Sequence, residues 1–300
     1  RTRCVTVSDI YSALTENRPY RAALSQDAAF PAQIEDCKAA IRWLRRQKDV
    51  DDDRIGVLGW SHGADATLHL LGREIPSIRA AVTYYPACRQ LLDRKDYRVS
   101  APTLVLVGDI MLDEGPGRTI AAGGDPLAPF AATLAAADYR IGNLECSVAN
   151  GGTAQPSKLW SFRARPEALQ VLRGRFDAVS LANNHSGDFG PAAFAETLDH
   201  LATAGIASFG GGRNLTEAHR PLWIKKNGLT IAVLGYNEYK PRRFEAGPHT
   251  PGIAWSEDEQ VIADIRAARA AGHSRARQRP SASIRFMVHT PFNIRFLFVL

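Results

Sequence analysis

Short runs of apolar, often β-branched residues alternate along the chain with longer segments in which apolar residues recur every three or four positions. The runs are typical of buried strands, and the longer segments are typical of helices that cover a sheet. In the first part of the chain this pattern predicts a helix over 31–47, a strand over 54–58, a helix over 64–71 and a strand over 80–85. The alternation predicts an α/β fold.

The same alternation continues beyond an apolar strand that begins near residue 103 and ends in Gly108-Asp109. Gly205 follows a predicted helix where helices commonly end, and Asn227-Gly228 between two strands is a hairpin signal. Ser256 and Glu259 have the spacing of a capping box at a helix start. The other predicted elements are strands over 139–141, 177–181, 222–226 and 229–234 and helices over 125–137, 165–172, 191–204 and 256–272.

Ser61 stands in the sequence Gly59-Trp60-Ser61-His62-Gly63, between a predicted strand and a predicted helix. Glycines on both sides of such a serine permit a tight turn that lifts its hydroxyl above the edge of the sheet. The backbone N–H of His62 can then face the oxyanion that forms during ester hydrolysis. The spacing predicts a nucleophile at Ser61, with His62 as a backbone oxyanion donor.

This part of the chain, residues 1–103, resembles a fragment of the dienelactone hydrolase family of α/β-hydrolases. Besides the serine motif, the matching stretches are 53–56, 84–88 and 101–104. The resemblance implies part of an α/β-hydrolase sheet and hydrolysis of esters or lactones through Ser61. Asp109 or Asp113 is the candidate acid for this chemistry, but no later histidine stands in a matching context.

Polar residues also follow four of the predicted strands. Because the carboxyl ends of parallel strands meet at one edge of a sheet, we expect the four groups to line one cleft. Carboxylate, amide and imidazole groups together suit a divalent ion such as Mn²⁺, Zn²⁺ or Mg²⁺, and a pair of such ions orients water for displacement at phosphorus. The groups are Gly108-Asp109, Asn143-Leu144-Glu145, Asn183-Asn184-His185 and Asn237-Glu238.

The region from 104 to 272 resembles the CapA family, the poly-γ-glutamate capsule synthesis proteins related to calcineurin-like metallophosphatases. The resemblance is carried by the sequences at 108–112, 143–145, 182–185, 210–212 and 235–238. It implies a metallophosphatase-like α/β sandwich and a metal or phosphate-like centre containing Asp109, Glu145, Asn184 and His185.

We add further residues to this predicted centre from their positions after the strands. Asn143 joins the predicted ligands, and Asn183, Asn237 and Glu238 are expected to line the cleft. Asp188, close behind His185, is either a partner that orients the imidazole or only an acidic residue near the start of the next helix.

The last residues differ in character from the rest. Segment 273–300 holds five arginines and no acidic residue, which leaves a net charge of only +1 on the other residues out of the +6 of the whole chain. The basic charge therefore belongs to a tail, and we expect no nucleic-acid partner. We interpret 273–300 as a basic tail that is non-native or disordered.

Cysteine spacing and hydropathy restrict the remaining function classes. The four cysteines lie far apart without zinc-type spacing, so reduced thiols are expected. No apolar run approaches the roughly 20 residues of a membrane helix, and we expect neither a transmembrane segment nor a nucleotide cofactor. The chain begins at Arg1 without methionine, so the location, cytoplasmic or at the cell envelope, stays open. The oligomeric state also stays open.

The predicted architecture is α/β, with a partial α/β-hydrolase sheet over 1–103, a partial metallophosphatase-like α/β sandwich over 104–272 and the tail. Three functions stay open. The first is a CapA-like, metal-dependent hydrolase of capsule or poly-γ-glutamate biosynthesis, acting on a small-molecule or polymer substrate. The second is a serine esterase or lactonase using Ser61. The third is a catalytically inactive fusion of two fragments, because each predicted centre lacks partners that its family has.

Overall fold

The computed structural model describes residues 3–6, 26–48, 50–51, 55–60, 62–72, 78–84, 98–156, 158–226, 229–275, 285–289 and 294–299. The chain divides into two compact units. Unit 1 comprises Arg1–Gly108 and Ala128–Arg140, and unit 2 comprises Asp109–Leu127 and Ile141–Leu300. Both units combine helices with parallel strands, so the α/β fold class predicted from the alternation is confirmed.

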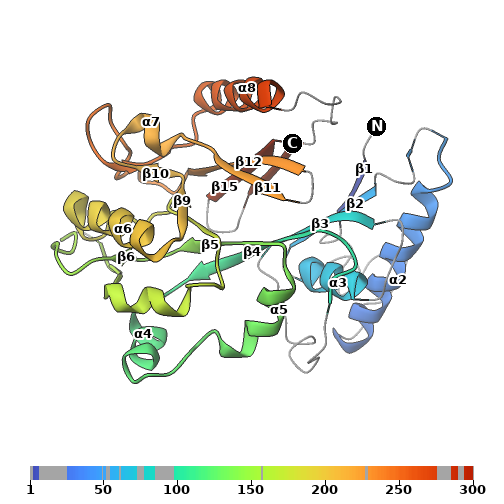
Figure 1. The fold of residues 1–300 in the computed structure, drawn as a ribbon, viewed down its shortest axis with the longest axis horizontal. Coiled ribbons are helices and arrows are strands. Elements are labelled where there is room, and N and C mark those ends of the chain that lie inside the picture. Colours follow the sequence, from blue (N-terminus) through green and yellow to red (C-terminus); the bar gives the residue numbers. More distant parts are fainter. Residues whose placement is uncertain are drawn as a thin grey trace. The chain divides into compact units, whose positions relative to one another are not determined.

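Unit 1 contains parallel strands with helices packed against them. Helix α3 lies against β2 and β3, and α2 packs on α3 (Figure 1). The strands are paired in the order β1-β2-β3-β4. The elements are β1 (Arg3–Thr6), α2 (Gln26–Leu44), β2 (Ile55–Trp60), α3 (His62–Leu71), β3 (Ile78–Tyr84) and β4 (Thr103–Ile110), whose last two residues belong to unit 2.

The core of unit 1 follows the apolar periodicity of α2. Ile34, Cys37, Ile41 and Leu44 recur at three- and four-residue spacing and are all buried. They belong to one apolar cluster with residues of β2 and α3, such as Ile55. Because this stripe drives the helix onto the core, α2 forms where the sequence predicts it, although it begins five residues earlier, at Gln26.

Residues 128–140 belong to unit 1, whereas the sequence assigned them to the second domain. Asp138 Oδ2 accepts a hydrogen bond from the backbone N–H of Thr103 at 2.8 Å, and Asp138 N–H donates to Thr103 O at 3.0 Å. Ala137 joins the apolar cluster of unit 1 together with Ala101 and Val105. These contacts are long-range in sequence, which is why periodicity alone does not reveal them.

The helix predicted from Asp125 begins later in the structure. A 3-10 turn, η3, covers Ala128–Phe130, and the α-helix α5 covers only Ala131–Ala136. The carboxylate of Asp125 accepts the N–H of Leu127 at 3.0 Å and also binds the guanidinium of Arg175. Asp125 therefore holds a turn and a distant cation instead of the first turn of a long helix.

Unit 2 contains a second set of parallel strands, ordered β5-β8-β9. Helix α6 ends at Gly205, which has φ 72° and donates its N–H to Ala202 O and Leu201 O, as the sequence predicts. The elements are α4 (Glu114–Ala121), β5 (Tyr139–Leu144), whose first two residues belong to unit 1, β6 (Ser147–Val148), β7 (Arg163–Ala164), the 3-10 helix η4 (Pro166–Val171), β8 (Ala178–Ser180), α6 (Gly190–Ala204) and β9 (Ala207–Phe209).

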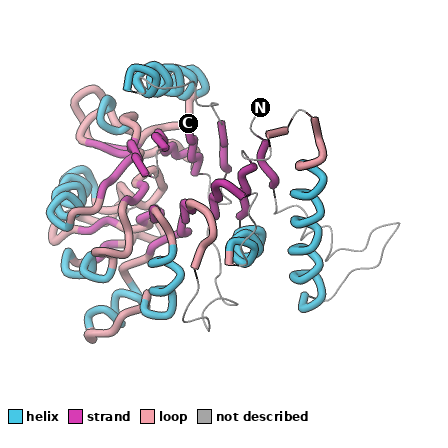
Figure 2. Tube along the Cα trace, turned by 45° about the vertical axis from the view of Figure 1, so that its right-hand side comes forward, coloured by secondary structure: helices cyan, strands magenta, loops and turns pink. Residues whose placement is uncertain are grey.

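An antiparallel sheet of four strands completes unit 2, in the order β11-β12-β15-β14. Helix α8 packs against β12 and β15 and runs along this sheet (Figures 1 and 2). The predicted hairpin is present, but its turn residues Asn227 and Gly228 lie outside the described residues. The elements are β10 (Gly211–Gly212), α7 (Leu215–Ala218), β11 (Leu222–Lys226), β12 (Leu229–Asn237), β13 (Gly252–Ile253), α8 (Asp258–Arg275), β14 (Arg285–His289) and β15 (Ile294–Val299).

The structure differs from the interpretation of 273–300 as a disordered tail. Helix α8 extends to Arg275, and β14 and β15 add two paired strands to β12. Four of the six residues of β15 are aromatic or β-branched, and β14 contains Phe286 and Val288; these residue types favour strands. Whether this segment is native sequence stays a prediction.

The capping box predicted at Ser256 and Glu259 is not formed. Helix α8 starts at Asp258, two residues later, and the Glu257 carbonyl accepts the N–H of Val261 at 2.8 Å. The hydroxyl of Ser256 is buried and has no hydrogen-bond partner among the described residues. The backbone N–H of Ser256 instead donates to Asn237 O, which holds this residue against the end of β12.

None of the helices in the described part of the chain has both the length and the apolar character needed to cross a lipid bilayer.

Candidate functional site

The ends of two neighbouring strands in unit 2 bring Asp109, Asn143 and Glu145 together. Asp109 is near the end of β4, Asn143 is near the end of β5, and Glu145 follows directly. The amide nitrogen Nδ2 of Asn143 donates to Asp109 Oδ1 at 2.8 Å and also to Glu145 Oε2. One amide group thus bridges two carboxylates that are 36 residues apart in sequence.

Asn183 determines which way the amide of Asn143 faces. Its own amide is oriented by the backbone, because Nδ2 donates to Leu144 O and Oδ1 accepts the His185 N–H, both at 2.9 Å. Asn183 Nδ2 also donates to Asn143 Oδ1 at 2.9 Å. Asn143 must therefore direct its oxygen at Asn183 and its NH₂ group at the two carboxylates.

His185 stands beside this group and is held from behind by Asp188. Its Nδ1 lies 2.8 Å from Asp188 Oδ2, which also accepts the backbone N–H of Phe162 at 2.8 Å. The ring of Phe162 lies against the imidazole, with a centroid distance of 4.6 Å. The other ring nitrogen, Nε2, is 3.8 Å from Glu145 Oε1. An imidazole held in this way presents Nε2 to the carboxylates.

Lys158 is part of the site, although it is not among the residues predicted from the sequence. Its ammonium group donates to Asp188 Oδ1 and, at 2.6 Å, to the backbone oxygen of Asn184, and it lies 3.1 Å from His185 Nδ1. Lys158 is 27 residues from His185 in a loop without strand or helix periodicity, so only the fold brings it here. A usable signal in the sequence is that 146–166 contains no acidic residue, so this lysine finds its partner elsewhere.

The two carboxylates differ in their surroundings. Glu145 is buried, with 8% of its surface exposed, whereas Asp109 faces solvent. Burial, and after it the negative charge of Asp109, raises the pKa of Glu145 to about 8. The site therefore combines an accessible carboxylate at its mouth with an inner carboxyl group that is costly to ionise.

The donor types at the site fit a divalent ion, but their arrangement is not that of a closed metal site. In the part of the chain that the structure describes, no three His, Cys, Asp or Glu side chains are grouped so that they hold an ion as they stand. The NH₂ group of Asn143 occupies the position between the carboxylates. Asp109, Glu145 and Nε2 of His185 are the groups whose chemistry suits such an ion, whereas Asn143 presents hydrogens.

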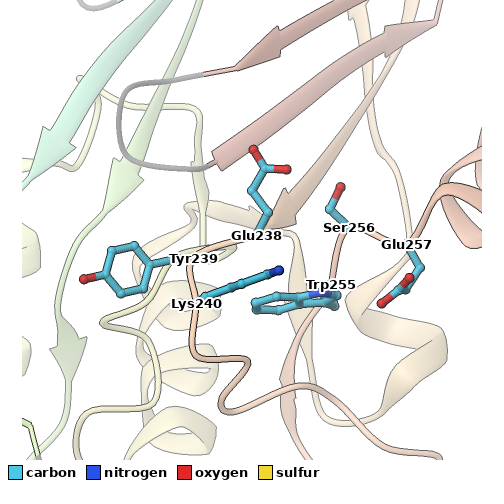
Figure 3. A pocket seen from close by; sticks show the side chains of 6 residues that line it. All are labelled: Glu238, Tyr239, Lys240, Trp255, Ser256 and Glu257. Carbon is cyan, nitrogen blue, oxygen red and sulfur yellow. The ribbon is translucent and has the colours of Figure 1, made fainter.

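The other predicted residues lie in different settings. Asn184 takes part through its backbone oxygen, which binds Lys158. Asn237 is buried, and its Oδ1 accepts the N–H of Tyr239 at 3.3 Å. Glu238 lines a separate pocket whose lining includes none of the residues around His185 (Figure 3). The structure thus joins three of the four polar groups by hydrogen bonds.

The predicted serine nucleophile, Ser61, lies outside the described residues. The backbone on either side of it is described: β2 ends at Trp60 and α3 begins at His62. The strand before position 61 and the helix after it thus follow the predicted order. The role of His62 as an oxyanion donor stays a prediction.

Comparison with known proteins places the Asp109–His185 network within one family. The sequence model of the family "Bacterial capsule synthesis protein PGA_cap" matches residues 103–276, more than half of the chain. The chain belongs to this family. The predicted resemblance to capsule synthesis proteins of the CapA type is confirmed, and every residue of the network lies within the matched segment.

Individual relatives agree with this family. The chain is 29% identical over 180 residues to the PGA biosynthesis protein CapA of Bacillus subtilis, covering 58% of this chain and 47% of that protein. It is 25% identical over 176 residues to the capsule biosynthesis protein CapA of Bacillus anthracis, covering 56% and 42%. A probable polyglutamine synthesis accessory protein of Mycobacterium tuberculosis is 29% identical over 141 residues, covering 45% and 37%. The chain therefore spans less than half the length of these relatives.

The N-terminal part has a different similarity. Residues 14–77 match the sequence model of the family BD-FAE, which agrees with the predicted hydrolase-like fragment. A solved structure of the 2,6-dihydroxy-pseudo-oxynicotine hydrolase aligns with a TM-score of 0.26 and 16% identity, over 36% of this chain and 38% of that chain.

Proposed function

We propose that the protein acts in the synthesis of a bacterial capsule polymer of the poly-γ-glutamate type, as a metal-dependent hydrolase at the Asp109–Glu145–His185 site. The observation that carries the proposal is the hydrogen-bonded network of these residues, which lies wholly within the segment matched by the capsule synthesis family. The names of the relatives support the polymer, since two of them are called CapA proteins.

The protein's own residues bring together donor groups that suit a divalent ion, although the described residues do not form a closed metal site as they stand. Asp188 holds the imidazole so that Nε2 faces the carboxylates, and Asn143 sets the positions of Asp109 and Glu145. A divalent ion would be held by Asp109, Glu145 and His185, and when bound it would supply a Lewis acid for hydrolysis. Asp109 faces solvent, where a polymer substrate has access.

The test measures metal content and hydrolysis on the same preparations. Purified protein is equilibrated with Mn²⁺, Zn²⁺ or Mg²⁺, desalted and analysed by mass spectrometry for bound metal, and release of glutamate from poly-γ-glutamate is followed. Asp109→Ala and His185→Ala should lose the metal and lower turnover by about 100-fold or more. Asp199→Ala, at an exposed carboxylate bound to Arg213, is the matched control. Protein that binds no metal, or hydrolysis that survives both substitutions, contradicts the proposal.

A second candidate, a serine esterase or lactonase using Ser61, is favoured by one observation in unit 1. A Cβ atom on Gly59 would lie 2.1 Å from Gly63 O, so the backbones of these two residues approach so closely that only glycine fits at position 59. A nucleophilic serine between a strand and a helix requires glycines that permit such a close approach. Hydrolysis of a p-nitrophenyl ester should disappear in Ser61→Ala and persist in Ser100→Ala. Equal activity in both variants contradicts this candidate.

The same two assays decide the third function, a fusion without catalysis. A folded preparation with neither polymer hydrolysis nor Ser61-dependent ester hydrolysis would support it. Either activity, lost with its own substitution, excludes it.

A further inference from the structure

Gly187 lies in the turn that carries His185 and Asp188, and the ring of Phe244 covers its α-carbon. A Cβ atom on Gly187 would lie 2.2, 2.6 and 2.7 Å from Cγ, Cδ2 and Cβ of Phe244, so a side chain there would displace the ring or the turn. The φ of Gly187 is not in the left-handed region. The ring, and not the backbone conformation, therefore requires glycine at this position.

Phe244 is itself in a strained conformation. Its φ of 58° is in the left-handed region, which is costly for any residue with a Cβ atom. Its carbonyl accepts the N–H of Ile253 at 3.0 Å, and its ring meets the ring of Phe194 edge to face, with 5.1 Å between the centroids. Arg242 binds both carboxylate oxygens of the next residue, Glu245. Strained residues that the surrounding structure fixes in this way cluster at functional sites.

The turn under this ring determines where the imidazole of His185 points. Asp188 directly follows Gly187; its Oδ2 lies 2.8 Å from Nδ1 of His185, and its N–H donates to His185 O at 3.1 Å. Nε2 of Gln155 donates to the carbonyl of Gly187 at 3.1 Å and so holds the carbonyl, while the Phe244 ring holds the α-carbon. A shift of the α-carbon would carry Asp188 with it, because protein interiors are close-packed and transmit strain.

We propose that Phe244 is a positioning residue that holds the imidazole of His185 through Gly187. The ring keeps the turn, and with it Asp188, in place, so that Nε2 of His185 stays directed at the carboxylates of the site. Loss of the ring should loosen the hydrogen bond between the imidazole and Asp188 without removing any group that forms it. The relevance of this orientation to hydrolysis rests on the proposed function, whereas the orientation itself is a property of the folded chain.

The test observes the imidazole directly, by NMR of chelator-treated protein that contains isotopically labelled histidine. Because a carboxylate only accepts hydrogen bonds, Nδ1 of His185 carries the proton that faces Asp188. Such a proton resonates far downfield and exchanges slowly with water, and its signal is assigned by its loss in His185→Gln. The equivalent proton of His219, whose Nδ1 lies 2.7 Å from Asp264 Oδ2, is an internal control in the same spectrum. If the unmodified protein shows no such signal for His185, the proposal is overturned.

Two single variants disturb the contact from either side. Gly187→Ala should speed the exchange of the His185 proton by about tenfold or more, because the new methyl group displaces the turn. Phe244→Gly should also speed it, because the α-carbon of Gly187 is left uncovered, although glycine adopts this backbone conformation without strain. Gly272→Ala is the matched control: its Cβ would lie 3.8 Å from the ring of Trp223, an ordinary contact, and it should leave the signal unchanged.

The double variant decides whether the two residues act on each other. With the ring removed the methyl group has room, so adding Gly187→Ala to Phe244→Gly should speed exchange by less than about threefold more. The same increase in both backgrounds overturns the proposal. If Gly187→Ala does not fold, Phe244→Gly, which introduces no clash, decides the proposal by itself.

A role of Phe244 in packing alone gives a different result. Phe244→Gly would then lower the free energy of unfolding and leave the His185 signal unchanged, which overturns the proposal. The measurement needs neither metal nor turnover, so failure of the proposed hydrolysis leaves it unaffected, and failure here leaves the Asp109–His185 assays standing.

Discussion

The Oδ2 atom of Asp188 lies 2.8 Å from Nδ1 of His185, three residues earlier in the chain. Asp188 is almost completely buried, with 1% exposed, and its other carboxylate oxygen binds the ammonium group of Lys158. A buried carboxylate needs such a cation, because ionised groups are costly to remove from water without a partner. The orientation of the imidazole thus depends on a lysine from a distant loop.

Lys158→Met should therefore destabilise the protein, by about 3 kcal/mol, because it leaves the Asp188 carboxylate buried without its cation. The measurement is the free energy of unfolding in urea. Lys225→Met, which removes an exposed lysine, should change it by less than about 0.5 kcal/mol. The double variant Lys158→Met/Asp188→Asn should recover part of the loss. Equal effects of the two lysine substitutions would show that the ion pair does not support the site.

The pKa of Glu145 leads to a prediction about pH. Its pKa is raised from 4.5 to about 8 by burial and by the charge of Asp109, so the folded protein holds the Glu145 proton more tightly than the unfolded chain does. The resulting stability is fully present below pH 4.5 and is lost as the pH rises through 8. In the presence of a chelator, the free energy of unfolding should fall over this range by a few kcal/mol more than in Glu145→Gln. Glu167→Gln, at an exposed position, should leave the pH dependence of the free energy of unfolding as it is in the unmodified protein. If Glu145→Gln also leaves this pH dependence unchanged, its assignment to Glu145 is contradicted.

The two buried cysteines should be protected from alkylation in the folded protein. Cys37 and Cys146 are 0% and 1% exposed, and burial raises the pKa of each thiol to about 12. Alkylation by iodoacetamide at pH 8 should therefore be slower than in the urea-unfolded chain by about 10³-fold or more at both positions. Mass spectrometry of the digested peptides measures each site separately. Rapid labelling of Cys146 in the folded protein would show that the end of β5 is open.

The last two strands allow a direct test of the segment beyond α8. Residues 232–237 of β12 pair with residues 294–299 of β15, so a chain ending at Arg275 should leave this edge of β12 open. Its amides should exchange hydrogen faster, and the truncated protein should associate, because an open edge pairs with other chains. Hydrogen exchange and light scattering measure the two effects. Leu297→Pro in the full chain removes one N–H of β15 and should weaken the same protection. Unchanged exchange in both variants would instead favour the interpretation of this segment as non-native sequence.

Much of the local structure is determined by the sequence itself. The stripe of Ile34, Cys37, Ile41 and Leu44 specifies a helix, and Gly205 ends another, because apolar periodicity and left-handed backbone conformations are local properties. The family motifs likewise select Asp109, Glu145 and His185 as candidate ligands from the sequence alone. Boundaries are less well determined, as the start of α5 shows, because Asp125 is held by Arg175, 50 residues away.

The tertiary structure decided how the polar residues are connected. The direction of the Asn143 amide follows from Asn183, whose own amide is set by the backbone at Leu144 and His185. Lys158 reaches Asp188, and Glu238 opens onto a different pocket, because loops of no regular periodicity carry these side chains. The sequence by itself determined which residue types follow each strand, through local patterning. Only the fold decided which of them touch, since such contacts depend on the path of the backbone between distant segments.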